Sequence, residues 1–194
     1  MKIRQTDVYL RYNIPVEVTV LVDSREKRPM LFPSTIRISH PERMYMAIPI
    51  AVNTQVTKLD FGDYTIKGHE NLCTIERKAS ALEIYKNLNE SHDRIRQAKA
   101  FRKLVSGCHH PYLLIEASPA ELLRETSLNK TPQITCHRLS LVLAKYGFHA
   151  LFIPWKSKSV DTRRKIGTLM VHIMLGYILG DTFDAFPPQL LEDE

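Results

Sequence analysis

The sequence contains few cysteines, and they follow no pairing pattern. Its 194 residues include three, Cys73, Cys108 and Cys136, which lie far apart in the chain. An odd number without a metal-ligand spacing argues against a disulfide framework and against a structural zinc site. We therefore expect reduced thiols in an intracellular protein.

Long hydrophobic runs and a targeting segment are also missing. Residues 1–20 mix charged and apolar side chains, unlike a signal peptide. The longest apolar run, residues 166–180, contains His172 and three glycines and is too short to cross a bilayer, which predicts a buried helix. We expect a soluble protein without a membrane partner, cytoplasmic in a bacterial or phage-like setting or nuclear in a eukaryotic one.

The composition is that of one globular domain. Hydrophobic residues make up 44% of the chain and charged residues 25%. The formal net charge of +6 favours a polyanionic partner. Charge alone is a weak argument, because many basic domains bind no nucleic acid.

Strand and helix patterns alternate along most of the chain. Residues 16–23 predict a strand with a buried centre, and residues 55–67 and 72–78 predict a β-hairpin around a turn at 68–71. Residues 30–55 are expected to form loops and short strands. Helices are expected from Ala81, with a break at 87–93 before the chain continues to Gly107, from Pro119, from Pro132 and from Asp161, with strands at 111–116 and 149–155. This order predicts an α/β sandwich with a mixed sheet.

Two acids and a lysine follow one another within the predicted hairpin. Asp63 lies thirteen positions before Glu76, which is followed directly by Arg77 and Lys78. The two-residue period of a strand puts Glu76 and Lys78 on one face and Arg77 on the other. Carboxylate oxygens suit Mg²⁺ or Mn²⁺, and a lysine can meet the charge of a phosphate or of activated water. The hairpin is thus a candidate metal site for phosphodiester hydrolysis.

A second charged cluster follows the strand at residues 16–23. We expect Asp23 and Glu26 to add metal ligands or to position a metal-bound water. Arg25 and Arg77 are expected to hold phosphate oxygens or to orient the acids, and Lys78 to orient the attacking water or neutralise the phosphate. Simpler interpretations stay open, because an aspartate after a glycine is commonly a turn residue and charged strand residues commonly face water.

Three short segments, LVDSREKRP, GDY and IERKAS, resemble the XPF-type structure-specific endonuclease domain over about residues 16–175. The family pattern has a V-D-x-R-E stretch, a Gly-Asp and a Glu-Arg-Lys followed by an acid four residues after the lysine. The resemblance implies a restriction-endonuclease-like three-layer sandwich with a central mixed sheet flanked by helices. It also implies divalent-metal-dependent cleavage of branched or flap DNA by a single domain over residues 1–194, with a core at about 16–180.

The same resemblance implies a set of functional residues. The family's functional positions fall on Asp23, Arg25, Glu26, Asp63, Glu76, Arg77 and Lys78. Within this set we expect Asp63, Glu76 and Asp23 to be the metal ligands.

The chain departs from the family pattern in two places. The acid after the Glu-Arg-Lys falls on Leu82, and the adjacent Glu83 is either a substitute or the partner of Ser80 in a capping box. The C-terminal helix-hairpin-helix domain of many relatives is not expected, because only residues 181–194 remain. Preference for a branch would then come from a partner protein or a homodimer, or be weak.

Basic residues follow the hairpin on a predicted helix. They are Arg94, Arg96, Lys99, Arg102 and Lys103. Such residues can track DNA phosphates without reading sequence, although a solvated helix face explains each of them equally well.

Two functions are the main hypotheses from the sequence. The first is a Mg²⁺- or Mn²⁺-dependent DNA endonuclease, with repair, recombination and a mobile-element role all open. The alternative is a catalytically silent DNA-binding or scaffolding subunit of a nuclease complex. The retained Asp63, Glu76 and Lys78 favour the first.

Overall fold

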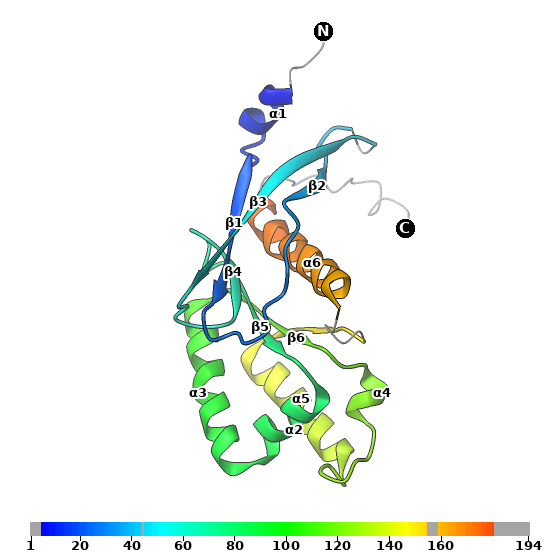
Figure 1. Ribbon diagram of the computed structural model, residues 1–194. Coiled ribbons are helices and arrows are strands. Elements are labelled where there is room, and N and C mark those ends of the chain that lie inside the picture. Colours follow the sequence, from blue (N-terminus) through cyan, green and yellow to red (C-terminus); the bar gives the residue numbers. More distant parts are fainter. Residues whose placement is uncertain (1–4, 44, 155–158, 181–194) are drawn as a thin grey trace, which may run out of the picture.

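A seven-stranded sheet forms the centre of the computed structural model, which describes residues 5–43, 45–154 and 159–180 (Figure 1). The strand order is β2-β3-β1-β4-β5-β6-β7. The strands are β1 (Glu17–Asp23), β2 (Thr35–Ser39), β3 (Ala47–Thr57), β4 (Tyr64–Ile66), β5 (Cys73–Lys78), β6 (His110–Ile115) and β7 (His149–Phe152). The helices are α1 (Gln5–Arg11), α2 (Ala81–Asn89), α3 (Ser91–Gly107), α4 (Pro119–Leu122), α5 (Pro132–Tyr146) and α6 (Val160–Leu179).

The sheet is mixed, as the sequence predicts. Strands β1 and β3 run parallel, as do β5, β6 and β7, whereas β4 is antiparallel to both of its neighbours. Strand β2 pairs antiparallel with β3 at the edge. Because β4 reverses the direction between two parallel groups, the ends of β1 and β5 reach the same side of the molecule.

Helices cover both faces of the sheet and complete three layers. Leu114 of β6 packs into the core beneath α6, whereas its neighbours Leu113 and Ile115 pack into a second core with α2, α3 and α5. The alternation follows from the two-residue period of a strand that is buried on both faces. The predicted α/β three-layer sandwich is confirmed.

The region at residues 30–57 differs from the sequence-based expectation. It contains β2 and an eleven-residue β3, where we expected loops and short strands. Pro49 is tolerated in β3 because it precedes the part of that strand that pairs with β1, which begins at Ala51. The predicted strand at 55–67 is also wrong in extent, since β3 ends at Thr57 and β4 begins only at Tyr64.

Helix boundaries follow the capping residues in the sequence. Helix α2 begins at Ala81 because the Ser80 hydroxyl accepts the Glu83 amide, and α4 begins with a full capping box between Ser118 and Glu121. Helix α5 ends at Gly147, whose φ of 64° is in the left-handed region. The break between α2 and α3 falls at Glu90, inside the predicted interval.

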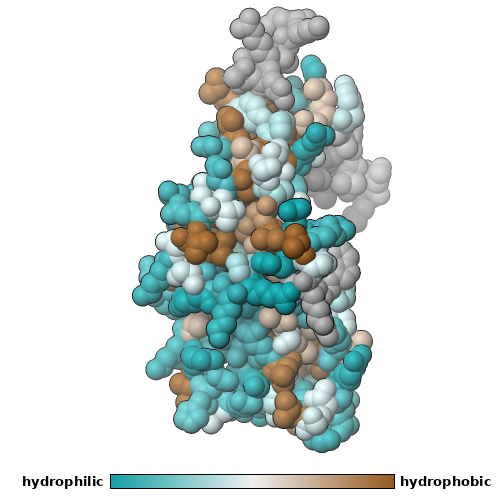
Figure 2. Space-filling view, viewed as in Figure 1, coloured by the Kyte–Doolittle hydropathy of each residue, from teal (hydrophilic) through white to brown (hydrophobic). Residues whose placement is uncertain are grey.

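The last long helix, α6, packs its apolar side chains into the core. Across the part of the chain that the structure describes, no helix has the length and apolarity to span a membrane. The expected end of the last strand at Trp155 and the segment after Asp181 lie outside the described residues. On the face shown in Figure 2, the lower half is largely hydrophilic, with hydrophobic side chains in separate patches.

Candidate active site at the ends of β1, β5 and β6

The start of β4 is held beside the ends of β1 and β5. The Asp63 amide donates to the Ile75 carbonyl at 2.9 Å, and the Asp63 carbonyl accepts the Asp23 amide at 2.8 Å. Gly62 has a φ of 65°, and a Cβ there would lie 2.2 Å from a Thr74 methyl carbon. A glycine is therefore required where the chain turns to deliver Asp63.

Asp63 is the least satisfied acid of this cluster. Its Oδ2 accepts the Arg77 amide at 2.7 Å, and among the described residues no other group donates to its carboxylate. Burial and the negative charge of Glu76 raise the pKa of Asp63 well above its ordinary value of 3.8, and Glu26 adds to the effect. Such a carboxylate is stabilised by a nearby cation.

Glu76 and Lys78 share one face of β5, as the strand period predicts. The Lys78 Nζ donates to Glu76 Oε1 at 2.6 Å and to Gln97 Oε1 at 3.1 Å, and it lies 3.7 Å from Glu83 Oε1. Burial by itself lowers the pKa of Lys78, but Glu76 and Glu83 outweigh it and raise the pKa. Lys78 is thus a buried, charged residue surrounded by acceptors.

Arg77 points to the opposite face and connects two further acids. Its Nε donates to Glu116 at 2.5 Å, and its Nη1 donates to Glu26 at 2.8 Å. Glu26 also accepts the Tyr64 hydroxyl at 3.0 Å. Because the Arg77 amide holds Asp63, one residue ties that aspartate to both acids of the far face.

Asp23 lies at the end of β1, but its carboxylate is occupied. Its two oxygens accept the Arg25 amide at 2.7 Å, Nε at 2.8 Å and Nη2 at 2.6 Å, and the Leu59 amide at 3.1 Å. Burial alone would raise the pKa of Asp23, yet the hydrogen bonds and charge of Arg25 outweigh burial and lower it. That Asp23 is a metal ligand stays a prediction, since in this arrangement it binds Arg25.

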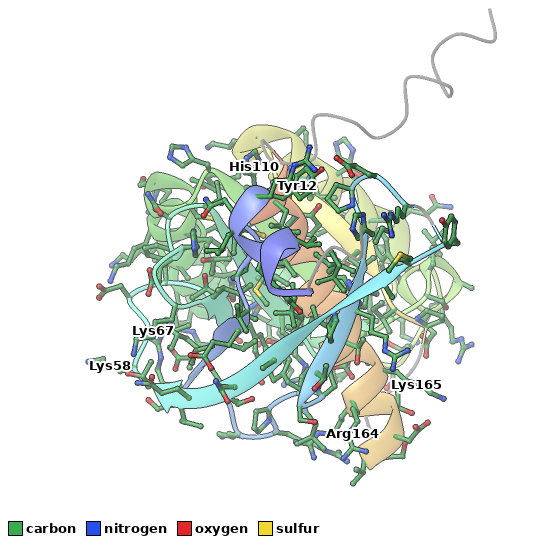
Figure 3. The ribbon with its side chains drawn as sticks, turned by 90° about the horizontal axis from the view of Figure 1, so that it is seen from above. Tyr12, Lys58, Lys67, His110, Arg164 and Lys165 are labelled. Carbon is green, nitrogen blue, oxygen red and sulfur yellow. The ribbon has the colours of Figure 1, made fainter. Side chains whose placement is uncertain are left out.

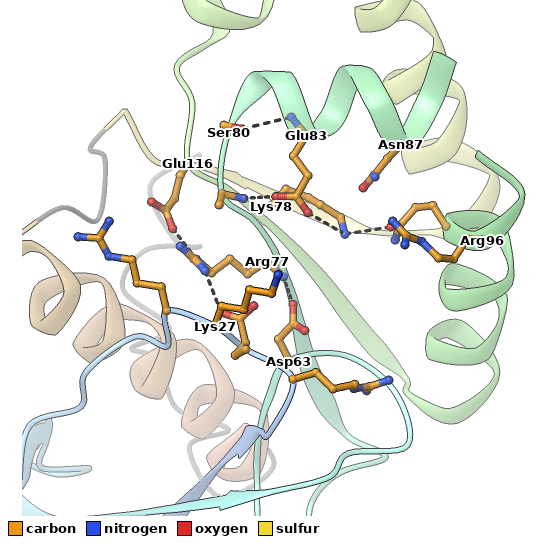
Figure 4. Close-up of a pocket in the computed structure, with 14 residues that line it drawn as sticks. Lys27, Asp63, Arg77, Lys78, Ser80, Glu83, Asn87, Arg96 and Glu116 are labelled. Carbon is orange, nitrogen blue, oxygen red and sulfur yellow. Dashed lines mark hydrogen bonds and ion pairs between the residues drawn. The ribbon is translucent and has the colours of Figure 1, made fainter. Parts of the chain in front are cut away.

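An open pocket of about 850 Å³ lies among these groups (Figure 4). Asp63, Arg77 and Glu116 line it at the strand ends, with Glu83 on α2 and Arg96 on α3. Arg25, Glu26, Lys27, Arg28 and Lys78 also line it. Five of the seven predicted catalytic residues therefore line one pocket, and the other two, Glu76 and Asp23, are hydrogen-bonded to its lining residues Lys78 and Arg25.

The donor set at this pocket suits a hard divalent cation. Among the described residues, no three His, Cys, Asp or Glu side chains gather as a complete metal cluster. Mg²⁺ commonly uses one or two protein carboxylates and completes its shell with water and substrate phosphate oxygens. Asp63 and Glu76 can supply these carboxylates, since each keeps one oxygen without a donor from the described residues.

The position of the family acid is occupied by a solvent-facing side chain. Leu82 is 43% exposed, so core packing does not require a leucine at this position. Glu83 accepts the Ala79 amide at 2.8 Å through Oε2, and its other oxygen faces Lys78. Glu83 therefore contributes to the start of α2 and to the pocket at the same time.

The basic residues of α3 do not form one stripe. All five predicted DNA-binding residues are exposed, but the helical period puts Arg96, Lys99 and Lys103 on one side and Arg94 on another. Arg96 lines the 850 Å³ pocket that contains Asp63, Glu83 and Glu116, called the acid pocket below. Arg94 lines a separate cavity near α5. Positive side chains also occur elsewhere, since Lys58 and Lys67 lie on the opposite side from Arg164 and Lys165 (Figure 3).

Sequence reasoning missed two residues of the site. Glu116 comes directly after the apolar strand β6, much as Asp23 is the last residue of β1, and this shared pattern was the available signal. Gln97 bridges Lys78 and Glu76 from α3, at 3.1 Å and 3.3 Å. Its position on a helix that resembles the family's was a signal, but its role in the site could not be assigned, because its partners come from packing α3 against β5.

Comparison with solved structures identifies the architecture. XPF from Aeropyrum pernix in complex with DNA superposes with a TM-score of 0.51 at 17% identity, covering 80% of this chain and 66% of that chain. The fold is XPF-like and restriction-endonuclease-like. The predicted resemblance to the XPF nuclease domain is thereby confirmed at the level of fold.

A second XPF structure from Aeropyrum pernix gives a TM-score of 0.48 at 18% identity, with coverage of 78% of this chain and 61% of that chain. The chain thus spans about three fifths to two thirds of the length of these XPF structures. No protein-family model and no curated protein sequence matches the chain at a significant level.

Proposed function

We propose that this protein is a Mg²⁺- or Mn²⁺-dependent DNA endonuclease. The observation that carries the proposal is that Asp63 lies close to the Glu76–Lys78 pair at one end of an XPF-like sheet. The raised pKa of Asp63 supports it, because two close carboxylates gain when a cation lies between them. An open pocket beside them leaves room for a DNA backbone.

Asp63 and Glu76 would hold the ion. When bound, it supplies positive charge for the attacking water, the leaving oxygen and the phosphate. Lys78 has only 5% of its side chain exposed and donates to Glu76, so we assign it to orienting that ligand. Arg25 has 63% of its side chain exposed beside Asp63 and Glu76 and is the better candidate to contact a phosphate oxygen.

Arg77 acts in this proposal as a positioning residue. Its amide holds Asp63, and its side chain is fixed by Glu26 and Glu116. A buried arginine between two carboxylates keeps its charge, since the acids raise its pKa against the opposing effect of burial. Glu26 and Glu116 therefore support the ligand geometry through Arg77.

DNA is the proposed substrate, with a branch or flap as the preferred structure. The exposed face of Arg96, Lys99 and Lys103 adjoins the acid pocket and can follow phosphates without base contacts. A DNA complex among the similar structures supports nucleic acid as the partner class. Preference for a branch would come from the shape of the pocket, a second copy or a partner protein.

A catalytically silent DNA-binding subunit is the second candidate. Leu82 at the position of the family acid and the occupied carboxylate of Asp23 favour it, since both reduce the number of available ligands. The two retained carboxylates at the pocket favour the enzyme.

Incubation with labelled flap, fork and plain duplex DNA, with Mg²⁺ or with EDTA, separates the two candidates. The enzyme predicts cleavage only with Mg²⁺, faster on flap or fork than on duplex. Glu76→Ala should abolish cleavage while circular dichroism and DNA binding stay close to wild type. Binding without cleavage in the wild type, with Mg²⁺ or Mn²⁺, would establish the silent subunit instead.

A further inference from the structure

Asn87 on α2 is a buried residue whose amide oxygen has no hydrogen-bond donor among the described residues. Its side chain lines the acid pocket (Figure 4), yet the residue is only 5% exposed. Its Oδ1 is buried, and no donor among the described residues reaches it. Buried polar atoms are nearly always hydrogen-bonded, so this oxygen is an acceptor left open to a partner beyond the described residues, which it can reach once the amide turns toward the pocket.

A second acceptor, Glu83, lines the acid pocket on the same helix as Asn87. Glu83 lies one helical turn earlier, on the same face of α2, and also lines the pocket. One Glu83 oxygen is taken by the Ala79 amide, and the other faces the pocket at 3.7 Å from Lys78 Nζ. Across from them, Gln97 is already hydrogen-bonded to Lys78 and Glu76. Apart from Asp63, the pocket acceptors discussed here that take no hydrogen bond from the described residues are Asn87 Oδ1 and Glu83 Oε1, both on α2.

The charges around these two acceptors limit the ligand that fits them. A cation would meet Lys78 beside Glu83 and the Arg96 guanidinium at the pocket edge. An anion would meet the Glu83 carboxylate, and an apolar group would leave the Asn87 oxygen unpartnered. A neutral group with two N–H donors satisfies both acceptors.

We infer that Glu83 and Asn87 form a subsite for an unpaired DNA base next to the cleaved phosphate. Asparagine and glutamate read exocyclic amino groups of bases, and enzymes that accept a base out of the stack read its exposed edge in this way. Arg96 offers a guanidinium plane on which the base can stack. The inference rests on the proposed action on DNA.

Thymine is the base that this subsite should reject. Adenine, cytosine and guanine each carry an exocyclic amino group with two N–H donors, whereas thymine offers one N3–H between two carbonyl oxygens and so can satisfy only one of the two acceptors. A site built to hydrogen-bond a substrate group discriminates against an analogue that lacks it, because its polar groups then stay unpaired. DNA with thymine at the bound position should bind more weakly than DNA with any other base there.

Fluorescence anisotropy in EDTA tests this without requiring cleavage. The probes are flap DNAs whose unpaired residues next to the junction are changed one at a time to A, C, G, T or an abasic site. The wild type should show one position at which T or an abasic site weakens binding by about tenfold, a typical contribution of one base-reading pair. Asn87→Leu should bring this ratio close to one, and Glu83→Gln should reduce it.

Asn89→Leu is the matched control, two residues further along α2. Asn89 donates to the Tyr85 carbonyl and Thr135 and accepts from Arg138, so its loss should lower the melting temperature and leave base preference unchanged. Asn87→Leu should melt at or above the wild-type temperature, because it removes a buried polar atom that has no partner.

The outcomes separate this inference from the proposed function. Equal binding of all bases at every position, or a preference that persists in Asn87→Leu, overturns the subsite. Mg²⁺-dependent cleavage without base preference would leave the nuclease standing and the subsite refuted. Base preference in EDTA without cleavage under any metal would support the subsite and refute the nuclease.

Discussion

Asp23 and Asp63 are neighbours across one strand pair, yet their carboxylates are in opposite states. The backbone amide of Asp23 donates to the carbonyl of Asp63 at 2.8 Å. Asp23 accepts from Arg25 and Leu59 through both oxygens, and its pKa is lowered. Asp63 accepts from the Arg77 amide alone among the described residues, and its pKa is raised. Proximity on a sheet therefore does not decide which acid can bind a metal, because the partners that each carboxylate already has decide it.

The largest expected difference between the two aspartates is in cleavage. Asp63→Asn removes a proposed metal ligand that supplies several kcal/mol of transition-state stabilisation, so its Mg²⁺-dependent rate on flap DNA should fall roughly a thousandfold. Asp23→Asn should lose only about ten- to a hundredfold, as a support of Arg25. Single-turnover cleavage at saturating enzyme measures both. Equal losses would mean that Asp23 is a ligand as well.

The second difference is in stability, and it has the opposite order. Asp23→Asn removes the charge that holds Arg25 and weakens the bond to the Leu59 amide, so the free energy of unfolding should fall by about 2 kcal/mol. Asp63→Asn removes like-charge repulsion with Glu76 and should leave stability unchanged or slightly higher in EDTA. Urea denaturation followed by circular dichroism gives both values. A greater loss in Asp63→Asn would contradict this ordering.

The smallest expected effect concerns the stability of the metal-free protein, which should depend on pH in opposite directions through the two aspartates. Folded Asp63 holds its proton more tightly than the unfolded chain, so its contribution to stability is lost as pH rises from about 4 through its raised pKa. Asp23 contributes above its ordinary value of 3.8 and loses that contribution as pH falls through its lowered pKa. Asp63→Asn should remove the decline in stability toward higher pH. Asp23→Asn should reduce the loss of stability in acid. Urea titrations at several pH values in EDTA test both slopes.

Local patterns in the sequence were sufficient for the hairpin part of the site. The strand period predicted that Glu76 and Lys78 share a face, and the 2.6 Å contact between them agrees. Ser80 marked the start of α2 at Ala81. Each of these signals acts over a few residues, which is why it could be read without the fold.

Features that depend on distant packing were not predictable in the same way. Asp23 is held by Arg25 and by the Leu59 amide, and the Leu59 carbonyl also accepts from Arg25, so this arrangement depends on where the segment after β3 lies. Gln97 meets Lys78 only because α3 packs on the same side of the sheet. The length of β3 was missed because its exposed, polar second half is stabilised by pairing with β1 rather than by its own composition.

The placement of Arg77 sets a limit on how this site can be moved between proteins. The β4–β5 hairpin carries Asp63, Glu76 and Lys78, but the groups that fix Arg77 come from the loop after β1 and from the end of β6. A hairpin grafted alone onto another scaffold would carry the acids without Glu26 and Glu116, which fix Arg77 and through it the position of Asp63. The transplantable unit is therefore the whole central sheet, and a designer who wished to reuse this chemistry would have to copy Glu26 and Glu116 together with the hairpin.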